Sequence, residues 1–162
     1  MCTLIRPYQP ADLESLRQIT ITCFDGTSVD QNIERLFGRL GDLDWGQKKA
    51  LTIDADADAN PEGIFVCELN DVVVAYITSR INKDTATGWI PNMAVLPEHQ
   101  KKGIGKALMS ATLDYLESEG MELVRIETLV QNEVGPTFYP NTGFQEIARQ
   151  IHYAMPLKNR KI

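Results

Sequence analysis

The sequence predicts an α/β fold in which a mixed β-sheet is flanked by helices. The chain has 162 residues, of which 43% are hydrophobic, enough for one domain with a proper core. Apolar residues recur with the spacing of a strand in some segments and of a helix in others. No internal repeat or linker interrupts this order, so we expect one domain over residues 1–162.

The first third of the chain predicts a strand followed by helices. Thr3–Arg6 reads as a short strand, and the apolar spacing after Pro10 predicts a helix, followed by a second helix over Asp30–Leu40. The segment 42–60 is less regular. Its alternating acids at 54–60 lack the glycine and the final glutamate of a calcium loop, so we expect a solvated surface loop there.

The remaining two thirds predict most of the sheet. Asn70-Asp71 is a two-residue hairpin connection between two strand patterns, and one long helix begins at the glycine loop and ends before Gly120. The expected strands are Ile64–Leu69, Val72–Ile81, Trp89–Val95, Leu123–Val130 and Gln145–Pro156, and the expected helix is Gly103–Glu119.

Composition excludes several classes of protein. A net charge of −6 argues against nonspecific nucleic-acid binding, and no apolar run reaches membrane-spanning length. The first seven residues lack the basic and then apolar regions of a signal peptide, and the sequence has no Cys-x-x-Cys pair. Neither histidine has a partner at ligand spacing. We therefore expect a cytoplasmic protein without a metal site, with Cys2, Cys23 and Cys67 as thiols.

A basic glycine loop between a strand and a helix is the most informative motif. Gly103 and Gly105 allow a tight turn, and amides from Lys101 to Ala107 lack carbonyl partners at a helix N-terminus, which favours a phosphate or pyrophosphate. A P-loop requires Ser or Thr where Ala107 stands, and a dinucleotide fold requires glycine where Leu108 stands. Both of these phosphate-binding motifs are excluded.

The pattern that remains resembles the acetyl-CoA loop of the GNAT superfamily of N-acetyltransferases. It consists of Gln100-x-x-Gly103-x-Gly105-Lys106-Ala107 preceded by Met93-Ala94-Val95. A second segment, from Glu127 through Asn132 and Tyr139 to Gly143-Phe144, is similar to a later strand, asparagine and tyrosine helix of that family. One departure is Gly135-Pro136, which predicts a late or short tyrosine helix.

The resemblance implies a GNAT-like fold, with a mostly antiparallel sheet of about six to seven strands and about four helices, and acetyl-CoA as co-substrate without a metal. It places the thioester carbonyl on amides of 93–95, where the neighbouring strand splays away, and the pyrophosphate on the glycine loop. Asn132 is expected to bond the pantetheine arm. The implied cofactor-binding residues are Met93, Ala94, Val95, Gln100, Lys101, Lys102, Gly103, Ile104, Gly105, Lys106, Ala107, Asn132 and Tyr139.

The same resemblance implies transfer of an acetyl group to a primary amine by direct attack in a ternary complex. Tyr139 is the candidate acid for the departing thiolate, and Glu127 is the candidate base, with a water chain as the alternative. Burial beside the thioester would raise the pKa of Glu127. A non-catalytic acyl-CoA sensor and transfer of a longer acyl group, into a roomier pocket near Tyr76 and Asn92, also remain open.

The sequence leaves the acceptor open between a small-molecule amine and a protein or peptide amine. Side chains that could line its cleft are Phe24, Asp42, Trp45, Tyr76 and Trp89, although aromatic residues at such positions more often belong to the core. A homodimer formed through the last strands is possible by analogy with the family.

Overall fold

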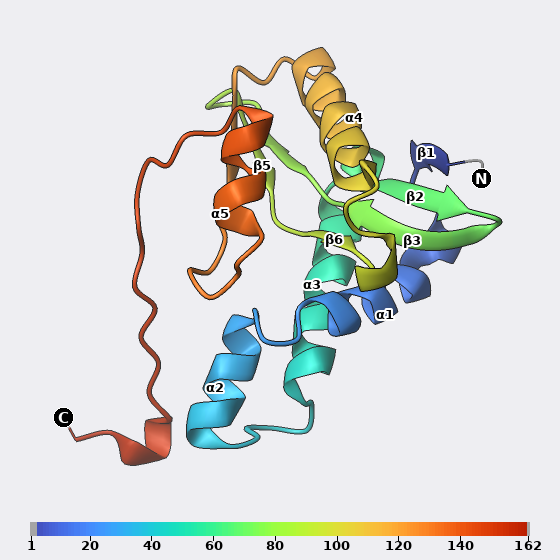
Figure 1. Ribbon diagram of the computed structural model, residues 1–162. Helices are drawn as coiled ribbons and strands as arrows, with labels where there is room; N and C mark the ends of the chain where they lie inside the picture. Colours follow the sequence, from blue (N-terminus) through green and yellow to red (C-terminus); the bar gives the residue numbers. More distant parts are fainter. Residues whose placement is uncertain (1–2, 162) are drawn as a thin grey trace.

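The computed structural model describes residues 3–161 and places seven strands in two sheets within that range (Figure 1). One sheet has the order β1-β2-β3-β6 and the other has the order β4-β5-β7. All pairs are antiparallel except β5 with β7. The expected mixed, mostly antiparallel sheet is confirmed. The strands are β1 Thr3–Pro7, β2 Phe65–Leu69, β3 Val72–Ile77, β4 Arg80–Asn82, β5 Thr87–Ile90, β6 Met93–Val95 and β7 Leu123–Ile126.

Helices cover both faces of the sheets. Helices α1 and α3 lie on one face, and α4 lies on the other (Figure 1). The helices are α1 Leu13–Cys23, α2 Val29–Phe37, α3 Trp45–Ala59, α4 Ile104–Ser118 and α5 Gly135–Phe138. Because alternate residues of a strand point to opposite faces, the strands contribute to two separate cores.

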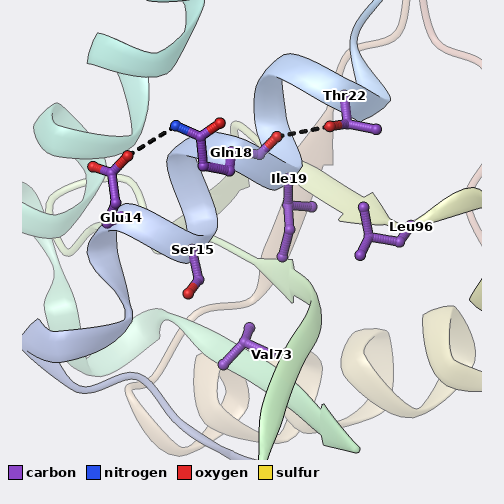
Figure 2. A pocket seen from close by; sticks show the side chains of 7 residues that line it. All are labelled: Glu14, Ser15, Gln18, Ile19, Thr22, Val73 and Leu96. Atoms are coloured by element: carbon purple, nitrogen blue, oxygen red, sulfur yellow. Dashed lines mark hydrogen bonds between the residues drawn. The ribbon is translucent and has the colours of Figure 1, made fainter.

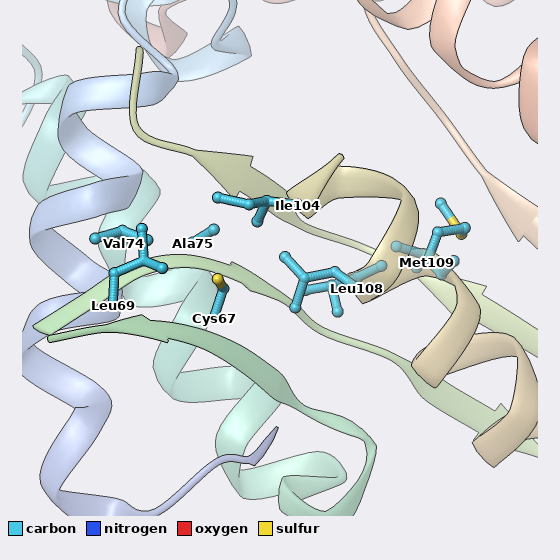
Figure 3. Close-up of a cluster of buried hydrophobic side chains, with 9 residues drawn as sticks. Cys67, Leu69, Val74, Ala75, Ile104, Leu108 and Met109 are labelled. Atoms are coloured by element: carbon cyan, nitrogen blue, oxygen red, sulfur yellow. The ribbon is translucent and has the colours of Figure 1, made fainter. Parts of the chain in front are cut away.

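The core under α4 joins that helix to β2, β3 and β5 (Figure 3). Its members are Cys67, Leu69, Val74, Ala75, Ile77, Ile90, Ile104, Leu108 and Met109. The core under α1 and α3 consists of Leu16, Ile19, Ile53, Ile64, Val66, Tyr76 and Ala94. The neighbours Val66 and Cys67 belong to different cores, as strand alternation requires.

The hairpin between β2 and β3 forms as the sequence predicts. Asn70 and Asp71 have φ angles of 49° and 64°, so both central residues of the turn are left-handed. Two left-handed residues match the twist of the strands that the turn connects, and Asn and Asp tolerate this conformation better than other residues with a side chain. The same strand pair has a bulge between Cys67 and Glu68, just before the turn.

The expected loop over 54–60 is wrong, because residues 54–59 belong to helix α3 and Asn60 is its C-cap. Asp44 caps the helix through its side chain, which accepts from the amide of Gln47 at 2.8 Å. Asp56 is fully buried beneath the helix, where its carboxylate pairs with Arg80 at 2.7 Å and accepts from the Thr78 hydroxyl at 2.6 Å. The acids are therefore helical residues facing different directions, and alanines between them favour the helix.

The expected strand over 145–156 is also wrong. The chain after α5 runs away from the sheet as one extended, unpaired stretch, drawn in red (Figure 1). Its apolar side chains alternate with polar ones, as in a strand, but Ile147, Ile151 and Tyr153 are 85%, 74% and 90% exposed. A strand needs a partner for its backbone groups, and alternation in the sequence does not supply one.

Two expected strands are each divided into two. Residues 72–81 form β3 and β4 with a break at Thr78-Ser79, and residues 89–95 are divided between β5 and β6 by Pro91-Asn92. Proline has no amide proton for a strand ladder, which accounts for the second break. Strand β7 ends at Ile126, four residues earlier than expected, and α2 ends at Phe37 rather than at Leu40.

Cys23 and Cys67 are free thiols, whereas Cys2 lies outside the described residues. No helix in the described part of the chain combines the length and apolar character that a bilayer span requires. Within residues 3–161, no cluster of three His, Cys, Asp or Glu side chains is arranged to hold a metal ion.

Replacing Asp56 by alanine is expected to destabilise the protein by about 3 kcal/mol, because Arg80, Thr78 and Asn92 all lose their buried partner. Urea unfolding measures this loss. Asp58→Ala on the exposed side of the same helix is the matched control and should change stability by less than about 0.5 kcal/mol. Equal losses in the two variants would contradict the role of Asp56.

Candidate active site

The site is built around a divergence of strands. β5 pairs in parallel with β7 from Thr87↔Leu123 to Ile90↔Ile126. After Pro91-Asn92 the chain continues as β6, which pairs with β3 and forms the edge of the other sheet. One side of β6 is therefore open next to the point where β7 leaves, as the sequence analysis expected for 93–95.

Backbone alternation gives the direction of the amides on β6. The Asn92 carbonyl accepts from Thr78 at 2.8 Å, and the Leu96 amide donates to Val74 at 3.0 Å, so even-numbered residues face β3. In an antiparallel pair the intervening residues direct their N–H and C=O groups the other way. Met93 and Val95 therefore present their amides at the open edge, whereas the amide of Ala94 faces β3.

Gln100 connects this open edge to the glycine loop. Its side-chain Nε2 donates to the carbonyl of Val95 at 3.0 Å. The bond holds the start of the loop against the end of β6. The backbone then turns through Lys101 and Gly103, whose φ angles are 59° and 83°.

Gly103 caps helix α4 in the left-handed conformation, and the first helical bond runs from the Ala107 amide to its carbonyl at 3.1 Å. Ala107 is thus not one of the free amides, contrary to expectation. The amides of 101–106 have no acceptor among the described residues. These six amides and the positive end of the helix dipole are available to an anion.

The side chains of the loop divide between solvent and core. Lys101, Lys102 and Lys106 are exposed, and the Lys102 Nζ donates to the Glu98 carbonyl at 2.8 Å. Ile104 is 4% exposed and packs in the α4 core, so only its amide is available to a ligand. Gly105 serves close packing, because a Cβ there would lie 3.2 Å from Met93 Cε and 3.3 Å from the Phe138 ring.

Tyr139 follows the short helix α5, which begins at Gly135-Pro136 as the departure in the sequence predicted. Its ring packs edge to face against Phe138 and Phe144, with centroids 5.5 Å and 5.9 Å away, and borders the same core as Met93. Burial raises the pKa of Tyr139 to about 12. The phenol is therefore protonated at neutral pH and can donate a proton.

Asn132 organises its own turn. Its Nδ2 donates to the Thr128 hydroxyl at 2.9 Å, and its Oδ1 accepts from the Val134 amide at 3.1 Å. One amide proton remains for a ligand. The expected bond to a pantetheine arm stays a prediction.

Glu127 lies immediately after β7 on the α3 side of the sheet. The Trp89 indole donates to its carboxylate at 2.5 Å, and Arg125 lies 3.6 Å away. Its side chain is 57% exposed, so the expected burial is absent. Trp89 therefore orients the carboxylate at a position that solvent can reach.

A polar network on the same face was missed by sequence reasoning. From Asp56 it extends to Arg80, whose guanidinium lies 5.5 Å from the Trp89 ring, and to Asn92, whose Nδ2 donates at 2.7 Å. Lys49 then donates to Asn92 Oδ1 at 2.6 Å. Each contact joins residues more than 20 positions apart, except Arg80 with Trp89, so local patterns carried no signal for it.

Of the residues predicted from sequence to line the acceptor cleft, one lies in the core and two lie beside the polar network. Tyr76 is fully buried, and its hydroxyl bonds that of Thr20 at 2.6 Å, so it belongs to the core. Phe24 lies at the end of α1 with its ring 4.2 Å from the Lys49 ammonium, and Trp89 contacts Glu127. Phe24 and Trp89 therefore flank the polar network.

A separate hollow of about 380 Å³ lies on α1 (Figure 2). It is lined by Glu14, Ser15, Gln18, Ile19, Thr22, Val73 and Leu96. None of the residues expected to bind the cofactor lines it. We therefore place the candidate site at the open edge of β6 and not in this hollow.

Residues 14–144 match the family model described as Acetyltransferase (GNAT) family. The chain belongs to the GNAT family. N-alpha-acetyltransferase 30 of Schizosaccharomyces pombe is 30% identical over 96 residues, which are 57% of this chain and 64% of that protein. The Escherichia coli K12 [ribosomal protein bS18]-alanine N-acetyltransferase is 30% identical over 84 residues, 52% of this chain and 55% of that protein.

These alignments span less than two thirds of each curated relative's length. The PaiA N-acetyltransferase of Thermoplasma acidophilum, solved with coenzyme A, superposes with a TM-score of 0.72 at 20% identity. That superposition covers 90% of this GNAT chain and 91% of the other. The similarity establishes a common fold across both chains.

Proposed function

We propose that this protein transfers an acetyl group from acetyl-CoA to a primary amine by direct attack in a ternary complex. One observation carries the proposal: the open edge of β6 and the free amides of 101–106 are joined by the bond from Gln100 to Val95. The loop suits a pyrophosphate, and the open edge suits an extended arm that ends in a thioester. The GNAT relatives support this choice.

In the proposed reaction the neutral amine attacks the thioester carbon, and the carbonyl oxygen becomes an oxyanion. Amides of Met93 and Val95, which point to the open edge, would donate to that oxygen. When the C–S bond breaks, the thiolate takes a proton from the Tyr139 phenol. The products are the acetylated amine and free CoA, and the proton that the amine releases returns through solvent to the Tyr139 phenolate.

Glu127 is proposed as the base that removes the proton from the amine. Its contact with Trp89 keeps it on the acceptor side, and its exposure allows one water to lie between it and the amine. The acetyl group is favoured over a longer acyl chain because Tyr76 and Asn92 are buried and hydrogen-bonded. We propose the cytoplasm as its compartment, which agrees with the two free thiols.

The proposed function is tested by titrating the protein with acetyl-CoA by calorimetry and then following thiol release with a panel of primary amines. Binding with amine-dependent release is the expected result. Binding without release from any amine would favour an acyl-CoA sensor. Absence of binding would contradict the proposal.

Gly103→Val is expected to weaken acetyl-CoA binding at least tenfold, because a β-branched residue disfavours the left-handed backbone that aims the loop amides. Calorimetry measures the affinity. Gly120→Val is the matched control, since Gly120 has φ 82° at the other end of α4 with open space around it. The control should lose similar stability and keep its affinity for acetyl-CoA. Equal affinity of the two variants for acetyl-CoA would exclude the glycine loop as its binding site.

Tyr139→Phe is expected to lower kcat by about 100-fold while changing acetyl-CoA affinity less than about threefold, because the phenol protonates the leaving thiolate and the ring packing is kept. Steady-state kinetics and calorimetry separate the two effects. Tyr153→Phe, which removes a hydroxyl from a 90% exposed ring, is the control. Weaker binding with normal kcat would reassign Tyr139 to packing.

We also propose a homodimer in which the segment 145–156 of one copy pairs with the open edge of β7 in another. Exposed apolar side chains on alternate residues and an edge strand support this arrangement. Ile151→Lys is expected to convert the dimer to a monomer in sedimentation velocity, because it puts a charge on the apolar side. Gln150→Lys adds the same charge on the other side and should leave the dimer intact; a monomeric unmodified protein would contradict the proposal.

A further inference from the structure

Lys49 is a half-buried cation that the proposed reaction does not use. Its ammonium donates to Asn92 Oδ1 at 2.6 Å and lies 4.2 Å from the centroid of the Phe24 ring. No carboxylate within the described residues forms an ion pair with it at 4.0 Å or less. Burial lowers the pKa of Lys49, against the opposing effect of Asp30 and Asp56.

The ammonium lies beside β6, where the thioester is proposed. Asn92 directly precedes β6, and Phe24 follows Cys23, whose thiol contacts the Val95 carbonyl at 3.5 Å. The head of Lys49 thus contacts the residue before β6 and the neighbour of a residue that contacts the end of β6. It is on the α1 and α3 side, whereas the glycine loop leads into α4 on the opposite face. In the proposed reaction the acceptor would therefore approach from the side of Lys49.

The surrounding network holds Lys49 without forming an ion pair with it. The one nearby buried carboxylate, Asp56, already pairs with Arg80 and accepts from Asn92 and Thr78. That arrangement fixes the Asn92 carboxamide with its oxygen toward Lys49. An ammonium has three N–H donors, and one is used here. Withdrawing a charge from water costs free energy unless further oxygen ligands compensate for it.

We propose that Lys49 binds the carbonyl or carboxylate oxygen next to the acceptor's amine, so that the acceptor is an α-amino acid or a peptide N-terminus. This inference rests on the proposed acetyl transfer. Both acceptors share an amino group one carbon away from an oxygen that can accept the Lys49 hydrogen bonds. A polyamine has no such oxygen, and its charges would be repelled by the ammonium.

The test compares Ala-Gly-Gly-amide, free alanine and spermidine as acceptors at saturating acetyl-CoA. We expect the unmodified protein to acetylate the peptide, the amino acid or both in preference to spermidine. Lys49→Met should lower kcat/KM for the preferred α-amino compound by about tenfold to 100-fold, the loss expected for a hydrogen bond to a charged group, and should not lower it for spermidine. A preference for the peptide would identify the oxygen that Lys49 binds as a peptide carbonyl, and a preference for alanine would identify it as a carboxylate.

Lys48→Met is the matched control, because it removes the same charge from the next residue of α3, where the Nζ donates to the Leu40 carbonyl. It should keep the kcat/KM of the unmodified protein. Acetyl-CoA affinity should be unchanged in both variants, and urea unfolding checks that Lys49→Met is folded. Equal losses in the two variants, or an equal loss for all three acceptors in Lys49→Met, would overturn the inference.

Calorimetry of the same peptide and of alanine into the protein saturated with CoA provides a readout without turnover. Tenfold weaker binding of the preferred compound to Lys49→Met supports the inference even where no transfer occurs. Efficient acetylation of spermidine with neither transfer to nor binding of the α-amino compounds would overturn it. Acetyl-CoA binding without transfer to any amine contradicts the proposed function instead, and the binding titration then decides the role of Lys49.

Discussion

The site depends on the break in one strand at Pro91-Asn92. Before the break, β5 lies between β4 and β7; after it, β6 lies beside β3 and has an open edge. A continuous strand paired with β7 along its whole length would have used the amides of Met93 and Val95 in the ladder. Because of the break, β5 pairs with β7, whereas the outer edge of β6 keeps backbone groups that a ligand could bind.

Buried polar contacts hold the break in place. Asn92 receives backbone and side-chain bonds from Thr78, and its carboxamide is bound by Asp56 and Lys49. An unpaired polar group at this depth would cost about 1–3 kcal/mol, so the network has to be nearly complete to be stable. Because α3 contributes both Asp56 and Lys49, the helix on the proposed acceptor side also fixes the strand geometry.

The parts that sequence reasoning predicted are those with local causes. The Asn70-Asp71 turn and the left-handed Gly103 follow from the conformations that these residue types tolerate, and the short α5 follows from Pro136. Helix α3 was missed because its alternating acids were compared with a calcium-binding loop and then interpreted as a solvated surface loop. The capping box formed by Asp44 and Gln47 was the local signal for the helix. The segment 145–156 has a strand pattern, but pairing depends on a partner that no local pattern specifies. Lys49 and Asn92 are 43 positions apart, and only the fold brings them together.

The placement of Lys49 also bears on the chemistry of the amine itself. An acceptor amine must lose its proton before it attacks. Where Lys49 binds the oxygen next to an α-amino group, its positive charge lies close to that group, lowers the pKa of the group and so favours the neutral form. Glu127, held by Trp89 at the end of β7, lies on the same face and would take the released proton. A cation and a carboxylate on one face of the sheet thus assist the same deprotonation: the cation disfavours the protonated amine, and the carboxylate accepts the proton that the amine releases.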